Sequence, residues 1–91
     1  MLKGSHRLGL LGFDALPWGE RHAKDSSVQA ALAQGCEQIY CEQEPGDAVF
    51  FNCLTLHCSE ANTSPDPRWA FLCAFDRMDN NALYILYVNN I

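Results

Sequence analysis

His57 ends a row of residues whose types and spacing could do chemistry. In an extended strand residues two apart share a face, so one side would carry Val49, Phe51, Cys53, Thr55, His57 and Ser59. An imidazole at the end of this apolar and small-residue row can bind a metal ion while its neighbours keep the site partly dry. The alternative is a histidine that is hydrogen-bonded in a core or at a strand end, because a metal site needs two further ligands.

Arg68 begins the next expected strand, after a loop that folds the chain back beside the first one. Small side chains two positions apart share its face, so its guanidinium has room to bind a carboxylate through two parallel hydrogen bonds. The Ser59 hydroxyl can bind the same carboxylate. The alternatives are a surface ion pair of Arg68 with Glu60 or Asp66, and a serine bonded within its own loop.

The five cysteines are an odd number, so they cannot all form disulfides within one chain. Most lie in apolar or alternating segments, where a free thiol behaves as a small buried hydrophobic group. A zinc site is the alternative, although the cysteine pairs lack the two-residue spacing typical of zinc ribbons and fingers. Its candidate ligands would be Cys36, Cys41, Cys53, His57 and Cys58.

A turn-rich first third and a strand-rich remainder must position these residues. Frequent glycines predict a loop over residues 4–19, and Ser26 or Ser27 can cap a short helix that Gly35 ends. Residues 44–47 predict a turn in which Pro45 and Gly46 supply the required backbone angles. Alternation and β-propensity then predict strands at residues 37–42, 48–56, 68–75 and 83–88. The order predicts a mainly β fold with one short helix: a loop and helix over 1–35, then strands over 37–88.

Composition and charge narrow the classes of protein. The 91 residues predict one domain, and 48% hydrophobic residues with 19% charged ones are typical of a globular protein. Eleven acidic against six basic side chains give a net charge of −5, which disfavours nucleic acid and anionic membranes as partners. The start of the sequence does not resemble a signal peptide, so we expect a cytoplasmic location or another reducing compartment.

The spacing of several of these residues resembles a known family. Gly46-Asp47-x-x-Phe50-Phe51, followed by His57-x-Ser59-x-x-Asn62-x-Ser64-x-x-x-Arg68, resembles the C-terminal motif of the phytanoyl-CoA dioxygenase family of iron(II)/2-oxoglutarate oxygenases. Gly4-Ser5-His6-Arg7 resembles a Pro-Gly-Ser-His segment that these enzymes carry upstream. Together the resemblance covers about residues 1–81 of the chain.

The resemblance implies a fold, cofactors and residue roles. It implies the C-terminal part of a double-stranded β-helix, a jelly-roll or cupin-like barrel that is incomplete here. It implies that His57 is an iron(II) ligand, that Arg68 binds the far carboxylate of 2-oxoglutarate, and that Ser59 assists Arg68. The implied activity is hydroxylation of a small organic substrate by a non-haem dioxygenase.

The sequence also departs from the family pattern. The family holds iron with a His-x-Asp pair as well, and no His-x-Asp or His-x-Glu occurs here. We therefore expect a fragment of an oxygenase that is inactive alone and that self-associates through exposed strands. Two other classes stay open: a non-catalytic interaction or regulatory module, and a small zinc-stabilised domain.

Overall fold

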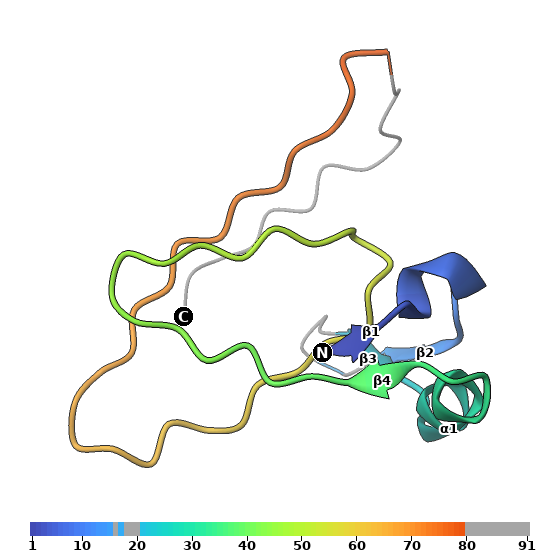
Figure 1. Ribbon diagram of the computed structural model, residues 1–91, viewed down its shortest axis with the longest axis horizontal. Coiled ribbons are helices and arrows are strands. Elements are labelled where there is room, and N and C mark those ends of the chain that lie inside the picture. The colour runs from blue at the N-terminus through green and yellow to red at the C-terminus, as the bar shows by residue number, and fades with distance from the viewer. Residues whose placement is uncertain (16, 18–20, 80–91) are drawn as a thin grey trace. The chain divides into compact units, whose positions relative to one another are not determined.

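Short elements near the N-terminus form the regular structure of this computed structural model, which describes residues 1–15, 17 and 21–79. Figure 1 labels the strands and the α-helix. In chain order the elements are β1 (Leu2–Lys3), the 3-10 helix η1 (Ser5–Leu8), β2 (Phe13–Ala15), β3 (Arg21–Ala23), α1 (Asp25–Ala33) and β4 (Glu37–Gln38). The described chain therefore combines short strands with one α-helix, which fits a mainly β fold loosely.

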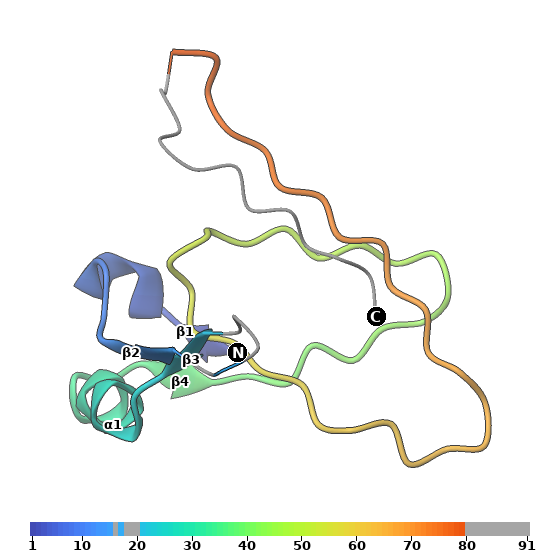
Figure 2. The same cartoon turned by 180° about the vertical axis from the view of Figure 1, so that it is seen from behind.

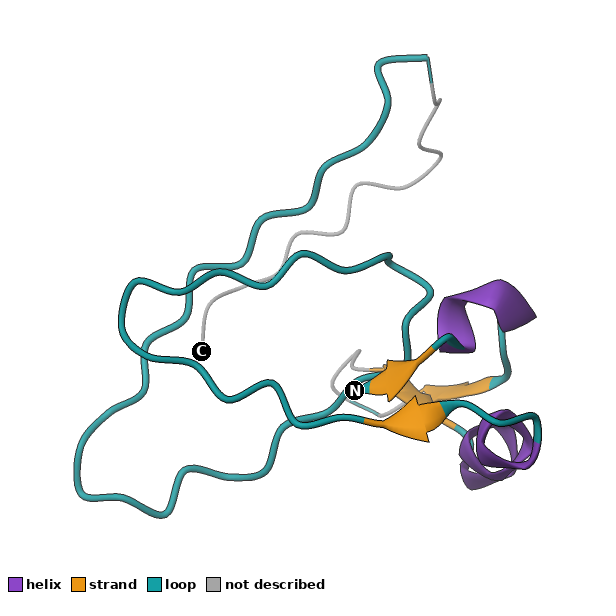
Figure 3. Cartoon of the chain, viewed as in Figure 1, coloured by secondary structure: helices purple, strands orange, loops and turns teal. Residues whose placement is uncertain are grey.

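The strands pair in two small antiparallel sheets (Figure 3). In one sheet β1 pairs with β4, with Leu2 opposite Gln38. In the other, β2 and β3 form a three-residue ladder centred on Asp14 and His22. Figure 1 and Figure 2 both show a long loop that leaves β4 and returns to β1.

The contacts within the chain divide it into two units, Met1–Ala61 and Asn62–Ile91. The first unit holds all the elements named above. Its buried residues, among those whose burial is described, are Leu2, Ser5 and Ala31. Every described residue of the second unit is exposed, and residues 62–79 contain no helix or strand.

The short helix was predicted correctly in place and in the way it ends. Alanine-rich sequence favours the helix, and Asp25 in its first turn complements the helix dipole. At its end Gly35 has φ +86°, Cys36 N–H donates to Ala31 O at 3.0 Å, and Gly35 N–H donates to Leu32 O at 3.0 Å. These two bonds are the Schellman motif, which a residue with a left-handed backbone completes.

The predicted serine cap is wrong. Lys24 occupies the N-cap position and makes no side-chain cap hydrogen bond. The Ser27 hydroxyl instead donates to Gly12 O at 3.2 Å, which ties the start of α1 to the chain before β2. A contact between segments has therefore replaced the local cap.

The long loop predicted at residues 4–19 is also only partly correct, because η1 and β2 lie within it. Gly4 and Gly9, with φ +90° and +74°, flank η1 on either side. The glycines thus separate short elements, and the hairpin partner β3 supplies the hydrogen bonds that make residues 13–15 a strand.

The strands predicted further along are corrected by the structure. Of residues 37–42 only Glu37–Gln38 is a strand, and residues 48–56 and 68–75 form no strand. Residues of high β-propensity become a strand only where a neighbouring strand offers a ladder, and among the described residues none is formed at these positions. The strand predicted at 83–88 lies outside the described residues.

The turn predicted at residues 44–47 is confirmed. Gly46 has φ +101°, and Asp47 N–H donates to Glu44 O at 3.0 Å. The Asp47 carboxylate accepts a second hydrogen bond, from Glu44 N–H at 3.0 Å.

No helix in the described part has the length and apolar character needed to cross a bilayer.

Candidate functional site

The imidazole of His57 is held by the backbone of its own segment. Its Nδ1 lies 2.8 Å from the carbonyl oxygen of Thr55. A carbonyl oxygen can only accept a hydrogen bond, so Nδ1 must carry the proton and donate it. In a neutral imidazole the other nitrogen, Nε2, then keeps its lone pair, which is the form in which histidine binds metals.

An aromatic ring sets the orientation of the imidazole further. The Phe51 and His57 ring centroids are 4.8 Å apart, with an angle of 56° between the ring planes. The sequence placed these two residues on one side of a strand, but a turn lies between them. His57 is exposed, so Nε2 belongs to a ring that solvent and a ligand can reach.

Asn52 builds the turn that brings Thr55 beside His57. Its side-chain Oδ1 accepts a hydrogen bond from Leu54 N–H at 2.9 Å, and its carbonyl oxygen accepts one from Thr55 N–H at 2.9 Å. Asparagine side chains commonly stabilise turns in this way. The turn replaces the predicted strand at this point, and it leads directly to the carbonyl group that holds His57.

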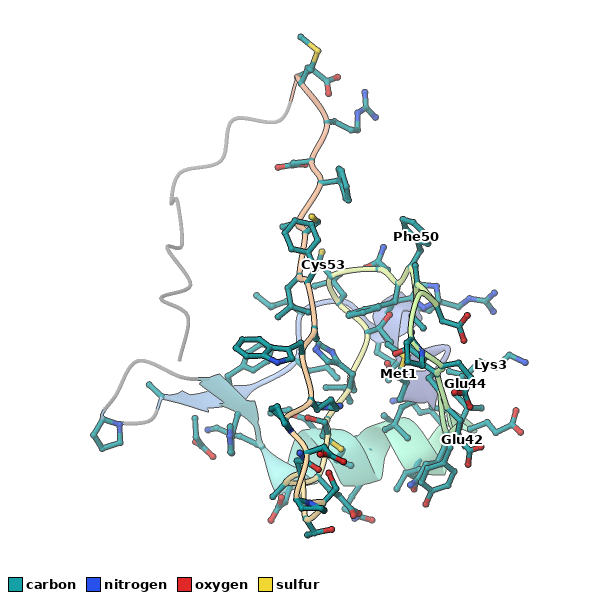
Figure 4. All side chains as sticks on the ribbon, turned by 90° about the vertical axis from the view of Figure 1, so that its left-hand side faces the viewer. Met1, Lys3, Glu42, Glu44, Phe50 and Cys53 are labelled. Carbon is teal, nitrogen blue, oxygen red and sulfur yellow. The ribbon has the colours of Figure 1, made fainter. Side chains whose placement is uncertain are left out.

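A pocket of about 410 Å³ lies next to this turn in the first unit. Phe51, which contacts the His57 ring, and Thr55, which accepts its hydrogen bond, both line the pocket. Met1, Lys3 and Phe50 also line it, and Figure 4 shows them on one side of the ribbon. It is a mostly apolar depression that is open to solvent, and its volume lies in the range of small-molecule sites.

The other predicted site residues are Ser59 and Arg68. Ser59 follows His57 in the first unit and is exposed, whereas Arg68 belongs to the second unit and is also exposed. Within the described part of the second unit, the surface ion pair considered for Arg68 with Asp66 is not formed. The guanidinium of Arg68 is therefore not neutralised by Asp66.

The loop before Arg68 is tied together by its own side chains. The amide of Asn62 donates to Asp66 O at 2.7 Å, and its Oδ1 accepts from the Ser64 hydroxyl at 2.8 Å. The Ser64 hydroxyl also lies 2.9 Å from Asp66 O. The Asn and Ser of the predicted motif thus shape the chain that leads to Arg68.

The cysteines do not behave as predicted. All five are free, but Cys36 is half-buried and the others are exposed, so the prediction of mostly buried thiols is wrong. The reason is the very small core, since Leu2 and Ala31 are the buried hydrophobic residues of the described chain. Within the described residues no three His, Cys, Asp or Glu side chains are grouped so that they could hold a metal ion, and the zinc ligand set is not assembled there.

Sequence reasoning missed two groups that shape this site. The Thr55 carbonyl could not be found from residue types, because every residue has a backbone carbonyl. Ser5 was noted only within the resembling Gly-Ser-His segment, yet it is buried and its hydroxyl bonds to Leu56 N–H. The resemblance of residues 4–7 to the family's Gly-Ser-His segment was the feature of the sequence that could have pointed to Ser5.

The chain matches a known protein family. The phytanoyl-CoA dioxygenase (PhyH) family model matches residues 1–70 of the 91-residue chain. This range contains His57, Ser59 and Arg68. Comparisons with curated proteins and with solved structures found no match.

Proposed function

We propose, since the chain belongs to the phytanoyl-CoA dioxygenase family, that it forms part of an iron(II)/2-oxoglutarate-dependent oxygenase in which His57 is one metal ligand. The hydrogen bond from His57 Nδ1 to Thr55 O carries this proposal. It assigns the proton to Nδ1 and leaves Nε2 free in the neutral ring, as a metal-binding histidine requires. A histidine buried in a core would not expose its ring as His57 does.

The donor set of the described residues fits one position of the metal site. Non-haem iron(II) oxygenases commonly use two histidines and one carboxylate on one face of the metal. The sequence contains no His-x-Asp or His-x-Glu pair, and the described part holds no cluster that could supply the remaining ligands. We propose that His57 acts with ligands contributed from outside this 91-residue sequence, and that the chain alone is inactive.

Arg68 and Ser59 are proposed to bind the 2-oxoglutarate carboxylate that is remote from the metal. The guanidinium of Arg68 is exposed and is not engaged by the Asp66 carboxylate of the same unit, so its donors are available to a ligand. Two parallel hydrogen bonds from a guanidinium match the geometry of a carboxylate. The Ser59 hydroxyl would add a third donor.

Each group has a distinct task in this proposal. When bound, iron(II) and 2-oxoglutarate supply the chemistry that activates oxygen for hydroxylation of a C–H bond. His57 holds its lone pair at a set position, with its ring oriented by Thr55 and Phe51. Arg68 and Ser59 would orient the cosubstrate. The pocket beside Phe51 offers space for a small organic substrate.

Anaerobic iron(II) titration of the isolated chain, followed by NMR of its histidine rings, tests the role of His57. Iron(II) should broaden the His57 signals, with weak affinity, because one imidazole supplies one bond. His57→Ala should remove that response and His22→Ala should not. Neither the chain nor the variants should form succinate from 2-oxoglutarate.

Two results would count against this proposal. Broadening that is equal at all three histidines would show that iron(II) binds without preference for His57. Succinate formation by the chain above the level of His57→Ala would contradict the proposed need for further ligands.

A second candidate function is an interaction module. The second unit exposes large apolar side chains almost completely, among them Trp69 at 90%, Phe71 at 92% and Phe75 at 84%. Exposed apolar surface of this kind marks a site of protein association. We infer that its partner is a second copy of this chain, and the whole-molecule prediction below tests that inference.

A further inference from the structure

Ser5 is a fully buried polar residue in the first unit. Its exposed fraction is 0%, while most described residues around it in sequence are accessible to solvent. Its hydroxyl donates to Leu2 O and accepts from Leu56 N–H, each at 2.8 Å. A hydroxyl has one proton to donate and lone pairs to accept with, so both capacities are used.

The bond to Leu56 joins positions that are 51 residues apart in sequence. A second bond closes the same contact, because Leu2 N–H donates to Leu56 O at 2.9 Å. Both backbone groups of Leu56 are thus held by the segment that contains β1 and the start of η1. We refer to this arrangement of Leu2, Ser5 and Leu56 as the Leu56 clamp.

The clamp is attached to the sheet of β1 and β4 and to the start of η1. Leu2 is 8% exposed and pairs with Gln38 in the sheet of β1 and β4. Ser5 opens η1, whose hydrogen bond from Arg7 N–H to Gly4 O is 3.0 Å long. Residues 40–61 form a loop without strands. The bonds of Leu56 to Leu2 and Ser5 attach the later part of this loop to the sheet.

His57 follows Leu56 directly. The Leu56 nitrogen and the Thr55 carbonyl share one planar peptide unit, so the hydrogen bond from Leu56 N–H to Ser5 also orients the carbonyl that accepts from His57 Nδ1. The Asn52 turn holds Thr55 on the other side of Leu56. The imidazole can reach Thr55 O only while the backbone between these residues keeps its path.

From these contacts we propose that Ser5 is a positioning residue for His57. By holding Leu56 N–H, its hydroxyl keeps the backbone path that lets His57 Nδ1 donate to Thr55 O and present Nε2 for metal binding. The inference rests on the proposed function, because positioning His57 matters for metal binding. The effect of Ser5 on the His57 tautomer can be tested without metal. Removal of the hydroxyl would leave Leu56 N–H, a partly buried donor, without its acceptor.

Two variants of the full 91-residue chain provide a matched test. Ser5→Ala removes the clamp hydroxyl. Ser27→Ala removes a hydroxyl that also bonds to a distant carbonyl, that of Gly12, but does not touch Leu56. NMR of isotope-labelled histidine at about pH 8, where an ordinary imidazole is neutral, measures the ratio of the two tautomers. His57→Ala identifies the His57 signals.

In the unsubstituted chain the Nδ1–H tautomer should dominate at His57. Loss of one hydrogen bond should reduce the tautomer ratio about fivefold in Ser5→Ala, and Ser27→Ala should leave it unchanged. Amide signals of α1 and of the β2–β3 hairpin report whether each variant keeps its fold. An unchanged ratio in a folded Ser5→Ala, or an equal change in Ser27→Ala, would overturn the inference.

Amide hydrogen exchange in the unsubstituted chain keeps the inference testable if Ser5→Ala does not fold. The Leu56 amide should exchange about tenfold more slowly than that of Cys58, which makes no hydrogen bond in the described part of the chain. Equal exchange at these two positions would overturn the inference. If iron(II) leaves His57 unaffected in the unsubstituted chain, the proposed function fails, while Ser5 is still judged by tautomer and exchange.

Discussion

His57 owes its proposed role to a contact at the scale of single atoms. Histidine can donate or accept at either ring nitrogen, and the Thr55 carbonyl removes this ambiguity by accepting a proton from Nδ1. The same residue type beside a hydroxyl group could adopt either form. A backbone acceptor therefore leaves the free lone pair on Nε2, the atom that we propose binds the metal.

At the residue scale we predict different effects for Arg68 and His57 in a complete oxygenase that contains this segment. Arg68→Lys should raise the 2-oxoglutarate concentration for half-maximal rate about tenfold, because an ammonium keeps the charge but loses the two-pronged geometry. His57→Ala should abolish turnover. Succinate formation measured against 2-oxoglutarate concentration distinguishes the two effects.

Arg77→Lys is the matched control for Arg68→Lys. The Arg77 guanidinium pairs with Asp79 within the second unit, so its replacement should leave the 2-oxoglutarate requirement unchanged. An Arg68→Lys enzyme with the original requirement would contradict the proposed role of Arg68.

Cys58→Ser separates the oxygenase from the zinc-stabilised domain. Cys58 is free and exposed, and the described residues hold no metal-binding cluster that includes it. We expect Cys58→Ser to keep its fold and to leave the response of His57 to iron(II) largely intact. Circular dichroism and metal analysis of the purified chain test this. Loss of bound zinc together with unfolding would instead favour the zinc domain.

At the scale of elements, the short strands and helices depend on what lies beside them. The ladder between β2 and β3 spans three residues on each strand, and that between β1 and β4 spans two. Sheets this small are marginal without additional contacts. Hydrogen bonds between segments, such as those of Ser27 and Ser5, supply such contacts.

The glycine that ends α1 provides a prediction at this scale. Gly35 has φ +86°, a conformation that costs a residue with a side chain about 1–2 kcal/mol. Gly35→Ala should therefore lower the free energy of unfolding by about 1 kcal/mol. Urea unfolding followed by circular dichroism measures the change.

Gly12→Ala is a suitable control, because Gly12 has no positive φ and an added Cβ would lie 3.4 Å from the flexible Lys24 side chain. It should cost less than Gly35→Ala. Equal costs would show that the left-handed backbone at Gly35 is not what makes glycine necessary there.

For the whole molecule, the small core and the exposed apolar side chains predict association. Besides Trp69, Phe71 and Phe75, the second unit exposes Leu72 and Met78, which no described contact covers. Burial of each large apolar side chain stabilises a complex by about 1.5–3 kcal/mol. Association would therefore remove the free-energy cost of exposing these side chains to water. The expected partner is a second copy of this chain, so association should occur in a solution of the purified chain alone.

Sedimentation of the isolated chain at several concentrations tests this expectation. The chain should self-associate, and Trp69→Ser with Phe71→Ser should weaken association at least about tenfold, because two buried aromatic rings are lost. Tyr40→Ser is the control, since Tyr40 is 81% exposed but belongs to the first unit. A monomer at all concentrations with cooperative thermal unfolding would count decisively against association.

Local sequence determined the elements whose interactions stay within a few residues. The turn at residues 44–47 and the end of α1 at Gly35 could be predicted, because proline, glycine and aspartate act on backbone angles and hydrogen bonds one to five positions away. The family could also be predicted, since the spacing from Gly46 to Arg68 is itself a property of the sequence.

Tertiary structure alone decided which segments found partners. β-Propensity at residues 48–56 and 68–75 could not show that no ladder forms there, because a strand depends on hydrogen bonds to a distant segment. The tautomer of His57 likewise depends on where the Thr55 carbonyl points. Ser5 meets Leu56 across 51 positions, and no local pattern encodes a hydrogen bond between residues so far apart.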